Sequence, residues 1–262
     1  MSKLSFFIFI LVLIVSLHAY SQDHQREPLG NIETFIDRFD EKNVVKNRNG
    51  WYHYYIPKGM ADTLTVKMSC VFEGTQTHLP HTHNEDEAFY IVKGPVIFHI
   101  NNVEKILNTG DLIYTPSGSY HKIQRPTSDT IKYLVIKREC LTSVDKPFQV
   151  EKNNYTFDDC HNPVENYKKT INKEFILLDK KFADGVQIIM NQLSKDDSIS
   201  NHNNQLLQQI AIYIIEGEAE VSLNGQKAII KNDNTFYCPK KARYSLKNTG
   251  KEPLIFLSIT TP

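Results

Sequence analysis

The feature that most constrains the fold of this chain is an internal repeat of one β-rich unit. Two pairs of matching segments define the repeat: 88–102 with 211–225, and 110–123 with 233–246. In the first copy, Gly94 lies in the first segment and Pro116 in the second. The equivalent residues of the second copy, Gly217 and Pro239, are separated by the same number of residues. Self-similarity at a fixed spacing indicates two copies of one structural unit.

The residues of each copy favour β-strands. Short runs of β-branched and aromatic residues, such as AFYIVK and LIFLSIT, alternate with Gly, Pro, Asn and Asp. Strands at such regular spacing are typical of a barrel or sandwich. We therefore predict an all-β chain with two tandem antiparallel β-barrels at residues 50–140 and 174–262. The more polar segments 22–49 and 141–173 are predicted to be an N-terminal arm and a connector.

Residues 1–21 have the pattern of a signal peptide. Lys3 precedes an unbroken apolar run from Leu4 to Leu17, and small residues follow at the spacing that a signal peptidase reads. The run is shorter than the roughly 20 residues that a helix needs to cross a bilayer. We predict cleavage of this segment, a periplasmic or secreted location, and no membrane contact of the mature chain. An uncleaved membrane anchor is the alternative.

The charge balance of the chain argues against polyanionic partners. The 262 residues include 30 Lys and Arg against 30 Asp and Glu. This near-neutral balance provides no basic surface for nucleic acid or an anionic membrane. We therefore expect a small-molecule substrate that is uncharged or weakly charged. We also expect the chain to act as a monomer or a homodimer.

The cysteines form no recognisable redox or zinc motif. The chain has four of them, at Cys70, Cys140, Cys160 and Cys238, and no two are close in sequence. Cys70 and Cys238 lie in apolar, strand-like runs and are expected to be buried thiols. A disulfide between Cys140 and Cys160 is possible, because an exported protein can form disulfides.

The segment HTHNEDE at 81–87 carries the strongest chemical signal. Alternate side chains of a strand share one face, so His81, His83 and Glu87 point the same way. Glu85 shares that parity and competes with Glu87 as a ligand. The later block GDLIYTPSGSYH returns a third imidazole, His121. Three imidazoles and one carboxylate suit a single divalent transition metal: Fe, Mn, Zn, Ni or Cu.

Two spaced motifs resemble those of the cupin family. They are His81-x-His83-x3-Glu87-x6-Gly94 and Gly110-x5-Pro116-x-Gly118-x2-His121. The resemblance implies a small jelly-roll-like antiparallel barrel, or double-stranded β-helix. It also implies that a metal is bound inside by His81, His83, Glu87 and His121, and its spacing favours Glu87 over Glu85. The family often has Asn four residues after the last histidine, where this chain has Arg125.

The second copy lacks the ligands of the first. Registering it on Gly217 places Asn204, Leu206 and Ile210 at the metal positions, and registering it on Pro239 places Tyr244 at the fourth. A shift of one or two residues recovers only His202. The sequence therefore predicts an intact metal site in the first barrel and a degenerate second barrel.

The resemblance implies a metal-dependent enzyme, and we expect a dioxygenase-type oxidoreductase that acts on a small phenolic or enolic substrate. Glu87 would double as a proton acceptor. Arg125 would receive a substrate carboxylate if its strand continues, whereas Pro126 would end the strand and turn Arg125 to water. One alternative is a non-redox isomerase, lyase or hydrolase acting on a sugar or organic acid. The other is a non-catalytic protein that binds a sugar or another small molecule.

Overall fold

The computed structural model describes residues 30–76, 79–82, 84–138, 155–168, 174–179, 185–201 and 207–262. The predicted signal peptide lies outside these residues. Ile32–Pro262 forms one compact unit. Among the described residues, no helix is long and apolar enough to cross a membrane.

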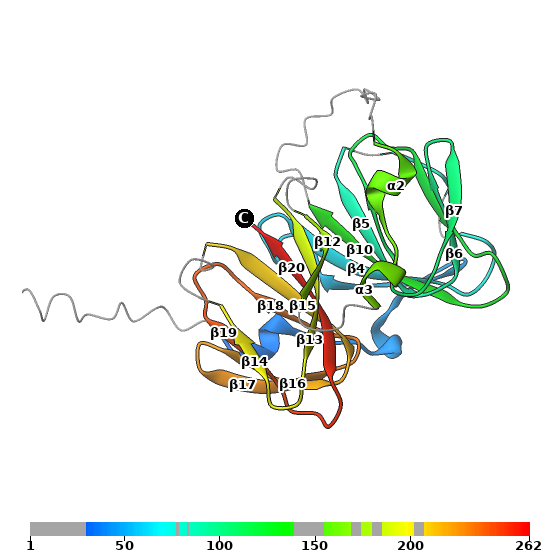
Figure 1. Ribbon diagram of the computed structural model, residues 1–262. Coiled ribbons are helices and arrows are strands. Elements are labelled where there is room, and N and C mark those ends of the chain that lie inside the picture. The colour runs from blue at the N-terminus through cyan, green and yellow to red at the C-terminus, as the bar shows by residue number, and fades with distance from the viewer. Residues whose placement is uncertain are drawn as a thin grey trace, which may run out of the picture. The chain divides into compact units, whose positions relative to one another are not determined.

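The prediction of an all-β chain is confirmed, and the first copy of the repeat contains one large and one small sheet (Figure 1). The seven-stranded sheet has the order β11-β8-β5-β10-β4-β3-β2, and the three-stranded sheet has the order β7-β6-β9. The strands of the large sheet are β2 (Val45–Asn47), β3 (Gly50–Ile56), β4 (Leu64–Val71), β5 (Glu87–Lys93), β8 (Leu112–Thr115), β10 (Ile131–Arg138) and β11 (His161–Asn162). Those of the small sheet are β6 (Val96–Ile100), β7 (Val103–Leu107) and β9 (His121–Gln124).

The second copy repeats this arrangement. Its six-stranded sheet has the order β1-β18-β15-β20-β13-β12, and its four-stranded sheet has the order β14-β19-β16-β17. The large sheet contains β1 (Ile36–Arg38), β12 (Glu174–Leu178), β13 (Gln187–Leu193), β15 (Gln209–Glu216), β18 (Asn234–Cys238) and β20 (Leu254–Thr261). The small sheet contains β14 (Ser198–Ser200), β16 (Glu218–Leu223), β17 (Gln226–Lys231) and β19 (Tyr244–Asn248). The central order β8-β5-β10-β4 matches β18-β15-β20-β13, which confirms the structural repeat.

The helical segments of the described residues are all short. They are η1 (Ile32–Phe35), η2 (Glu41–Asn43), α2 (Phe157–Cys160) and α3 (Glu165–Lys168). Thr156 begins α2 with a capping box, because its side chain accepts from the Asp159 amide and the Asp159 carboxylate accepts in return. All four lie in the predicted arm and connector.

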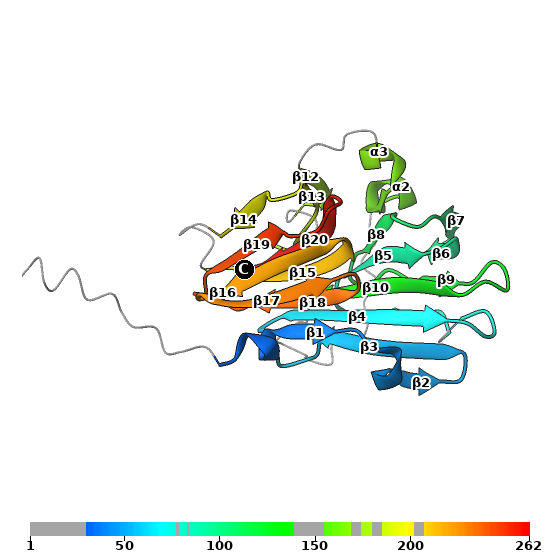
Figure 2. The ribbon, with the colours of Figure 1, turned by 90° about the horizontal axis from the view of Figure 1, so that it is seen from below.

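The arm and the connector exchange strands between the two barrels. The arm strand β1 precedes the first barrel but pairs with β18 of the second, opposing Ile36 to Phe236 (Figure 2). The connector strand β11 precedes the second barrel but pairs with β8 of the first, opposing His161 to Ile113. Each barrel therefore completes the edge of its large sheet with a strand from the segment that leads into the other barrel.

Turn chemistry fixes the hairpins of the two small sheets. Asn101 (φ 51°) lies in the turn between β6 and β7, and Asn224 (φ 48°) with Gly225 (φ 89°) lies between β16 and β17. Positive φ at these positions is typical of the two-residue turns whose twist matches antiparallel strands. Asn and Gly tolerate this backbone region better than other residues.

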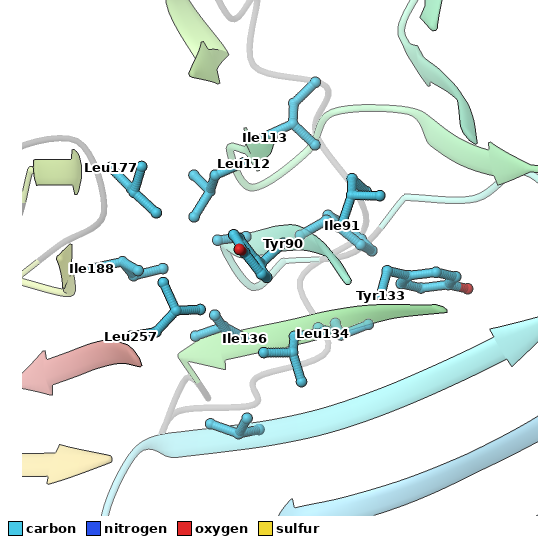
Figure 3. Packing of buried hydrophobic residues seen from close by; sticks show 14 of the residues in the cluster. Tyr90, Ile91, Leu112, Ile113, Tyr133, Leu134, Ile136, Leu177, Ile188 and Leu257 are labelled. Atoms are coloured by element: carbon cyan, nitrogen blue, oxygen red, sulfur yellow. The ribbon is translucent and has the colours of Figure 1, made fainter. Parts of the chain in front are cut away.

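The large sheets of the two barrels contribute to one hydrophobic core. Figure 3 shows Leu134 and Ile136 of β10 together with Ile188 of β13 and Leu257 of β20. All four are buried members of a single cluster. Because full burial of such a side chain stabilises a fold by about 1.5–3 kcal/mol, this core holds both copies in one unit. The opposite face of each large sheet points into its own barrel.

Gly110 is the backbone position where we expect substitution to be most costly. Its φ is +96°, and an added Cβ would lie 2.6 Å from Cγ2 of Val164 in the connector. Gly110→Ala is therefore expected to lower the free energy of unfolding by about 2–4 kcal/mol in urea denaturation, from backbone strain and overpacking together. Gly225→Ala is the matched control, because its φ is +89° and nothing lies within 4 Å of the added Cβ. Equal losses in both variants would contradict the role of the Val164 contact.

Candidate active site in the first barrel

The interior of the first barrel contains a cavity of about 300 Å³ that is lined by both polar and apolar side chains. Strands from both sheets contribute to its wall. The lining residues are Asn47, Tyr52, Lys67, Ser69, His81, Glu87, Phe89, His121, Tyr133, Val135 and Lys137. Three of the four metal ligands predicted from the sequence are in this set, and the fourth, His83, lies outside the described residues.

Strand register brings the charged groups to one face. Lys137 on β10 lies opposite Glu87 on β5, and Val135 lies opposite both Phe89 and Lys67. Alternate side chains of a strand share a face, so these residues point into the barrel together. The residues that alternate with them along each strand lie on the other face of the sheet and pack into the core that the two barrels share.

The two histidines approach each other through their backbones as well as their rings. The His81 amide donates to the His121 carbonyl at 3.3 Å, and the His121 amide donates to the His81 carbonyl at 3.0 Å. Their ring centroids are 4.7 Å apart. His121 is buried, and its Nε2 lies 3.1 Å from Oε2 of Glu87.

Backbone carbonyls set the tautomer of both imidazoles. Nδ1 of His121 lies 3.0 Å from the Ser119 carbonyl, and Nδ1 of His81 lies 3.3 Å from the Leu79 carbonyl. A carbonyl oxygen only accepts, so each Nδ1 donates. Nε2 is then the nitrogen of each ring that is left to ligate a metal.

The donor set of this wall fits a divalent ion. Two adjacent ligands of an octahedral ion, each about 2.1 Å from it, are about 3.0 Å apart, close to the separation of His121 Nε2 and Glu87 Oε2. Within the described residues, no three His, Cys, Asp or Glu side chains form a metal-binding group. The fit therefore depends on the His121–Glu87 pair, with His81 beside it.

Lys137 orients the carboxylate of Glu87. Its Nζ lies 3.0 Å from Oε1 of Glu87, which leaves Oε2 as the oxygen closer to His121. Glu85 does not line the cavity, although its Oε2 lies 4.0 Å from Lys137 Nζ. Of the two glutamates that share a parity in the sequence, the structure places Glu87 at the site.

Lys67 also lines the cavity and was not predicted from the sequence. Its Nζ lies 5.9 Å from the ring centroid of Tyr52 and 5.8 Å from that of Tyr54. Burial lowers the pKa of Lys67, the charge of Glu87 opposes that change, and Lys137 adds to it. A usable signal was present in the sequence, because Thr65, Lys67 and Ser69 form a polar face on an otherwise apolar strand.

Arg125 does not line the cavity. Strand β9 ends at Gln124, immediately before it. The Arg125 guanidinium donates to the Phe72 carbonyl, and its amide donates to the Thr75 carbonyl at 2.8 Å. These bonds hold Arg125 against the segment that follows β4. The two cations of the cavity wall are Lys67 and Lys137 instead.

In the second barrel, hydrogen bonding places Asn201 at the position of His81. The Asn201 amide donates to the Tyr244 carbonyl at 3.3 Å, and Asn201 Oδ1 accepts from the Tyr244 amide at 2.9 Å. This corrects the alignment of Asn204 with His81, because the second copy has a longer loop before β15. Ile210 does occupy the position in the second barrel that is equivalent to Glu87, because it pairs with Cys238 as Glu87 pairs with Thr115. His202, Asn204 and Leu206 lie outside the described residues.

The described cysteines are buried. Burial raises the pKa of Cys70 to about 11, and it raises the pKa of Cys160 and Cys238 to about 12. These thiols are therefore protonated at neutral pH and are poor nucleophiles. The possible disulfide between Cys140 and Cys160 involves Cys140, which lies outside the described residues.

Comparison with known proteins identifies both barrels. The family Cupin_2, described as "Cupin domain", matches residues 68–137 and 194–260, which together make up just over half of the chain. Acireductone dioxygenase of Leishmania braziliensis is 26% identical over 127 residues, and that of Leishmania major is 27% identical over 129 residues. Each match covers 43% of this chain and 37% of the relative. The chain thus spans little more than a third of the curated relatives it matches.

Solved structures agree with the whole two-barrel fold. The formate complex of Lactobacillus farciminis oxalate decarboxylase has a TM-score of 0.65 at 14% identity, covering 90% of this chain and 87% of that one. Bacillus subtilis oxalate decarboxylase at pH 4.6 has a TM-score of 0.67 at 15% identity, covering 92% and 78%. A further structure, from work on the Mn(II) centres of the Bacillus subtilis enzyme, has a TM-score of 0.63 at 15% identity, covering 92% and 79%. At these identities the likeness concerns the fold alone.

Proposed function

The chain belongs to the cupin family, with two cupin domains, and we propose that the first domain is the active site of a metal-dependent enzyme. One observation carries the proposal. His121 Nε2 and Glu87 Oε2 converge to 3.1 Å in the wall of the cavity, with His81 beside them. His83 completes the proposed ligand set. The ion is one of Fe, Mn, Ni, Cu or Zn, and the Mn(II) centres of Bacillus subtilis oxalate decarboxylase favour Mn.

The proposed chemistry is oxygen insertion into a small enolic or phenolic substrate, and the acireductone dioxygenase relatives support it. When bound, the metal supplies a Lewis acid and, if it is a redox metal, a centre for oxygen chemistry. Glu87 would hold the metal through Oε2 and would accept a proton from a substrate hydroxyl at Oε1. Lys137, whose Nζ lies 3.0 Å from Oε1, orients that oxygen. Phe89 and Val135 supply the apolar part of the cavity and exclude water from it.

A second candidate is a lyase that acts on a small organic acid. The two ammonium groups of the cavity, Lys67 and Lys137, favour an anionic substrate, and oxalate decarboxylase shares the fold over about nine tenths of the chain. We further propose that the protein is exported to the periplasm or secreted, which the pattern of residues 1–21 supports.

The first experiment is elemental analysis of the full chain purified from its native compartment, beside a His81→Ala/His121→Ala variant. We expect about one equivalent of Fe, Mn, Ni or Cu in the native chain and none in the variant. Oxygen consumption with enolic and phenolic compounds then tests the dioxygenase, and CO₂ release from small carboxylates tests the lyase. Zinc in place of a redox metal would favour the non-redox reaction. No metal after reconstitution would overturn the proposal and leave a small-molecule binding protein.

A further inference from the structure

We propose that Lys67 binds the anionic group of the substrate, and that the first barrel therefore selects a small carboxylate or enolate. The inference rests on the proposed function, since it assigns the substrate class of the same site. It concerns a residue on β4, a strand that carries none of the predicted metal ligands. It also gives Lys67 a role in specificity, apart from any step of proton transfer.

The surroundings of Lys67 favour an anionic ligand there. Lys67 is half-buried, and withdrawing an ammonium group from water costs free energy unless a partner compensates. Among the described residues, no carboxylate forms an ion pair with Lys67, while Lys137 is paired with Glu87. The nearby groups are the faces of Tyr52 and Tyr54, which attract a cation weakly and leave its donors available.

The charge of the cavity selects an anion. Its lining contains two ammonium groups, on Lys67 and Lys137, and the carboxylate of Glu87 is the one acid among the described lining residues. Since Lys137 already neutralises Glu87, the charge of Lys67 remains, and a divalent ion would add to it. The volume of about 300 Å³ limits the ligand to a small molecule.

The second barrel shows that Lys67 is not needed to build this fold. Lys67 pairs with Val135 between β4 and β10, and the equivalent pair between β13 and β20 is Ile189 with Ser258. Ile189 therefore occupies the position of Lys67. A barrel of the same strand order thus forms with an apolar side chain at this position.

The other two charges are also absent from the second barrel. Lys137 pairs with Glu87 between β10 and β5, and the equivalent pair between β20 and β15 is Thr260 with Ile210. Both ammonium groups and the carboxylate are thus replaced together. This joint replacement supports the assignment of Lys67 to the same functional set as Glu87.

The test measures anion affinity separately from metal affinity. The full chain and its Lys67→Met, Lys67→Gln and Lys67→Arg variants are loaded with Mn²⁺ and titrated with oxalate, an anion, and with imidazole, a neutral metal ligand. Lys132→Met is the matched control, because Lys132 lies on β10 but not in the cavity lining. We expect Lys67→Met and Lys67→Gln to weaken oxalate binding about tenfold or more, the loss of one charged hydrogen bond. Mn²⁺ and imidazole affinities should stay within about twofold, and Lys67→Arg should retain oxalate binding.

Two results would overturn the assignment: oxalate affinity unchanged in the folded Lys67→Met and Lys67→Gln variants, or a parallel loss of oxalate and imidazole affinity. A native chain that binds Mn²⁺ but no oxalate would also overturn it. If the native chain binds no divalent metal, the proposed function fails, and the same oxalate titration is run on the metal-free chain. If the metal-free native chain binds oxalate and Lys67→Met does not, the anion site is still supported. If the native chain binds no oxalate, or if Lys67→Met binds it equally well, the anion site is contradicted.

Discussion

His121→Ala is expected to lower the affinity of the chain for a divalent metal by about 100-fold or more while both barrels remain folded. His121 presents its Nε2 3.1 Å from Glu87 Oε2, and its Nδ1 lies 3.0 Å from the Ser119 carbonyl. Loss of a group that merely orients a ligand costs roughly 10–100-fold in affinity, and loss of the ligand itself should cost at least as much. Equilibrium dialysis against increasing concentrations of Mn²⁺ or Zn²⁺ measures the metal affinity of each variant. The same loss is expected for His81→Ala and His83→Ala.

The second barrel provides the matched control for this prediction. Tyr244 occupies the position of His121, and its amide donates to Oδ1 of Asn201, where the His121 amide donates to the His81 carbonyl. Tyr244→Phe should leave metal affinity unchanged and alter stability only slightly. Full metal occupancy in folded His121→Ala would show that His121 is not a ligand. Metal loss in Tyr244→Phe would place binding in the second barrel instead.

The residues that could be placed from the sequence are those fixed by motif spacing. Glu87 and His121 follow from that spacing, and the repeat indicates that the two copies share one strand order. The parity argument for His81 and Glu87 does not hold, because β5 begins at Glu87 and His81 lies before it, in an isolated bridge to His121. His81 reaches the same cavity wall as Glu87 and His121 through that bridge.

Lys67 escaped prediction because a polar face on a strand usually meets water. Strand β4 is covered on both faces: Val66 and Met68 pack into the core shared by the barrels, and Lys67 and Ser69 line the cavity. Which face of a strand meets solvent depends on what packs against the sheet, and a single strand does not contain that information.

The exchange of β1 and β11 escaped prediction for a different reason. Strand pairing between Ile36 and Phe236 joins segments at opposite ends of the chain. Local propensity identifies neither the partner nor the register of so short a strand. The same holds for Asn201, where an extended loop shifted the alignment and only the hydrogen bonds to Tyr244 identify the equivalent residue.

Asp111→Ala is expected to lower the free energy of unfolding by about 3–5 kcal/mol at pH 7, a larger loss than at any other polar position considered. Asp111 is 2% exposed. Its Oδ1 accepts from the Val164 amide at 2.7 Å, and its Oδ2 accepts from the Asn108 amide at 2.8 Å. His161 Nε2 lies 3.3 Å from Oδ2. Removing the carboxylate leaves buried donors without an acceptor and releases the connector from the first barrel.

Asn234 is the matched control for Asp111, because its Oδ1 accepts from the Lys231 amide at 3.0 Å in the equivalent turn of the second barrel. Asn234→Ala removes one neutral hydrogen bond and should cost only about 1–2 kcal/mol. Urea denaturation of the two variants provides the comparison. Equal losses would show that the contacts of Asp111 to the connector contribute little to stability.

The stabilisation by Asp111 should also depend on pH. Burial by itself raises the pKa of this carboxyl, but the hydrogen bonds from His161, Val164 and Asn108 outweigh burial and hold the pKa below its ordinary value. A lowered pKa in the folded state gives stability that is complete above the unfolded value of about 3.9. That stability is lost as the pH falls through the folded pKa. Asp111→Asn, which cannot titrate, should therefore reduce the fall in unfolding free energy between about pH 5 and pH 2. An unchanged slope would show that Asp111 does not contribute to the acid sensitivity of the fold.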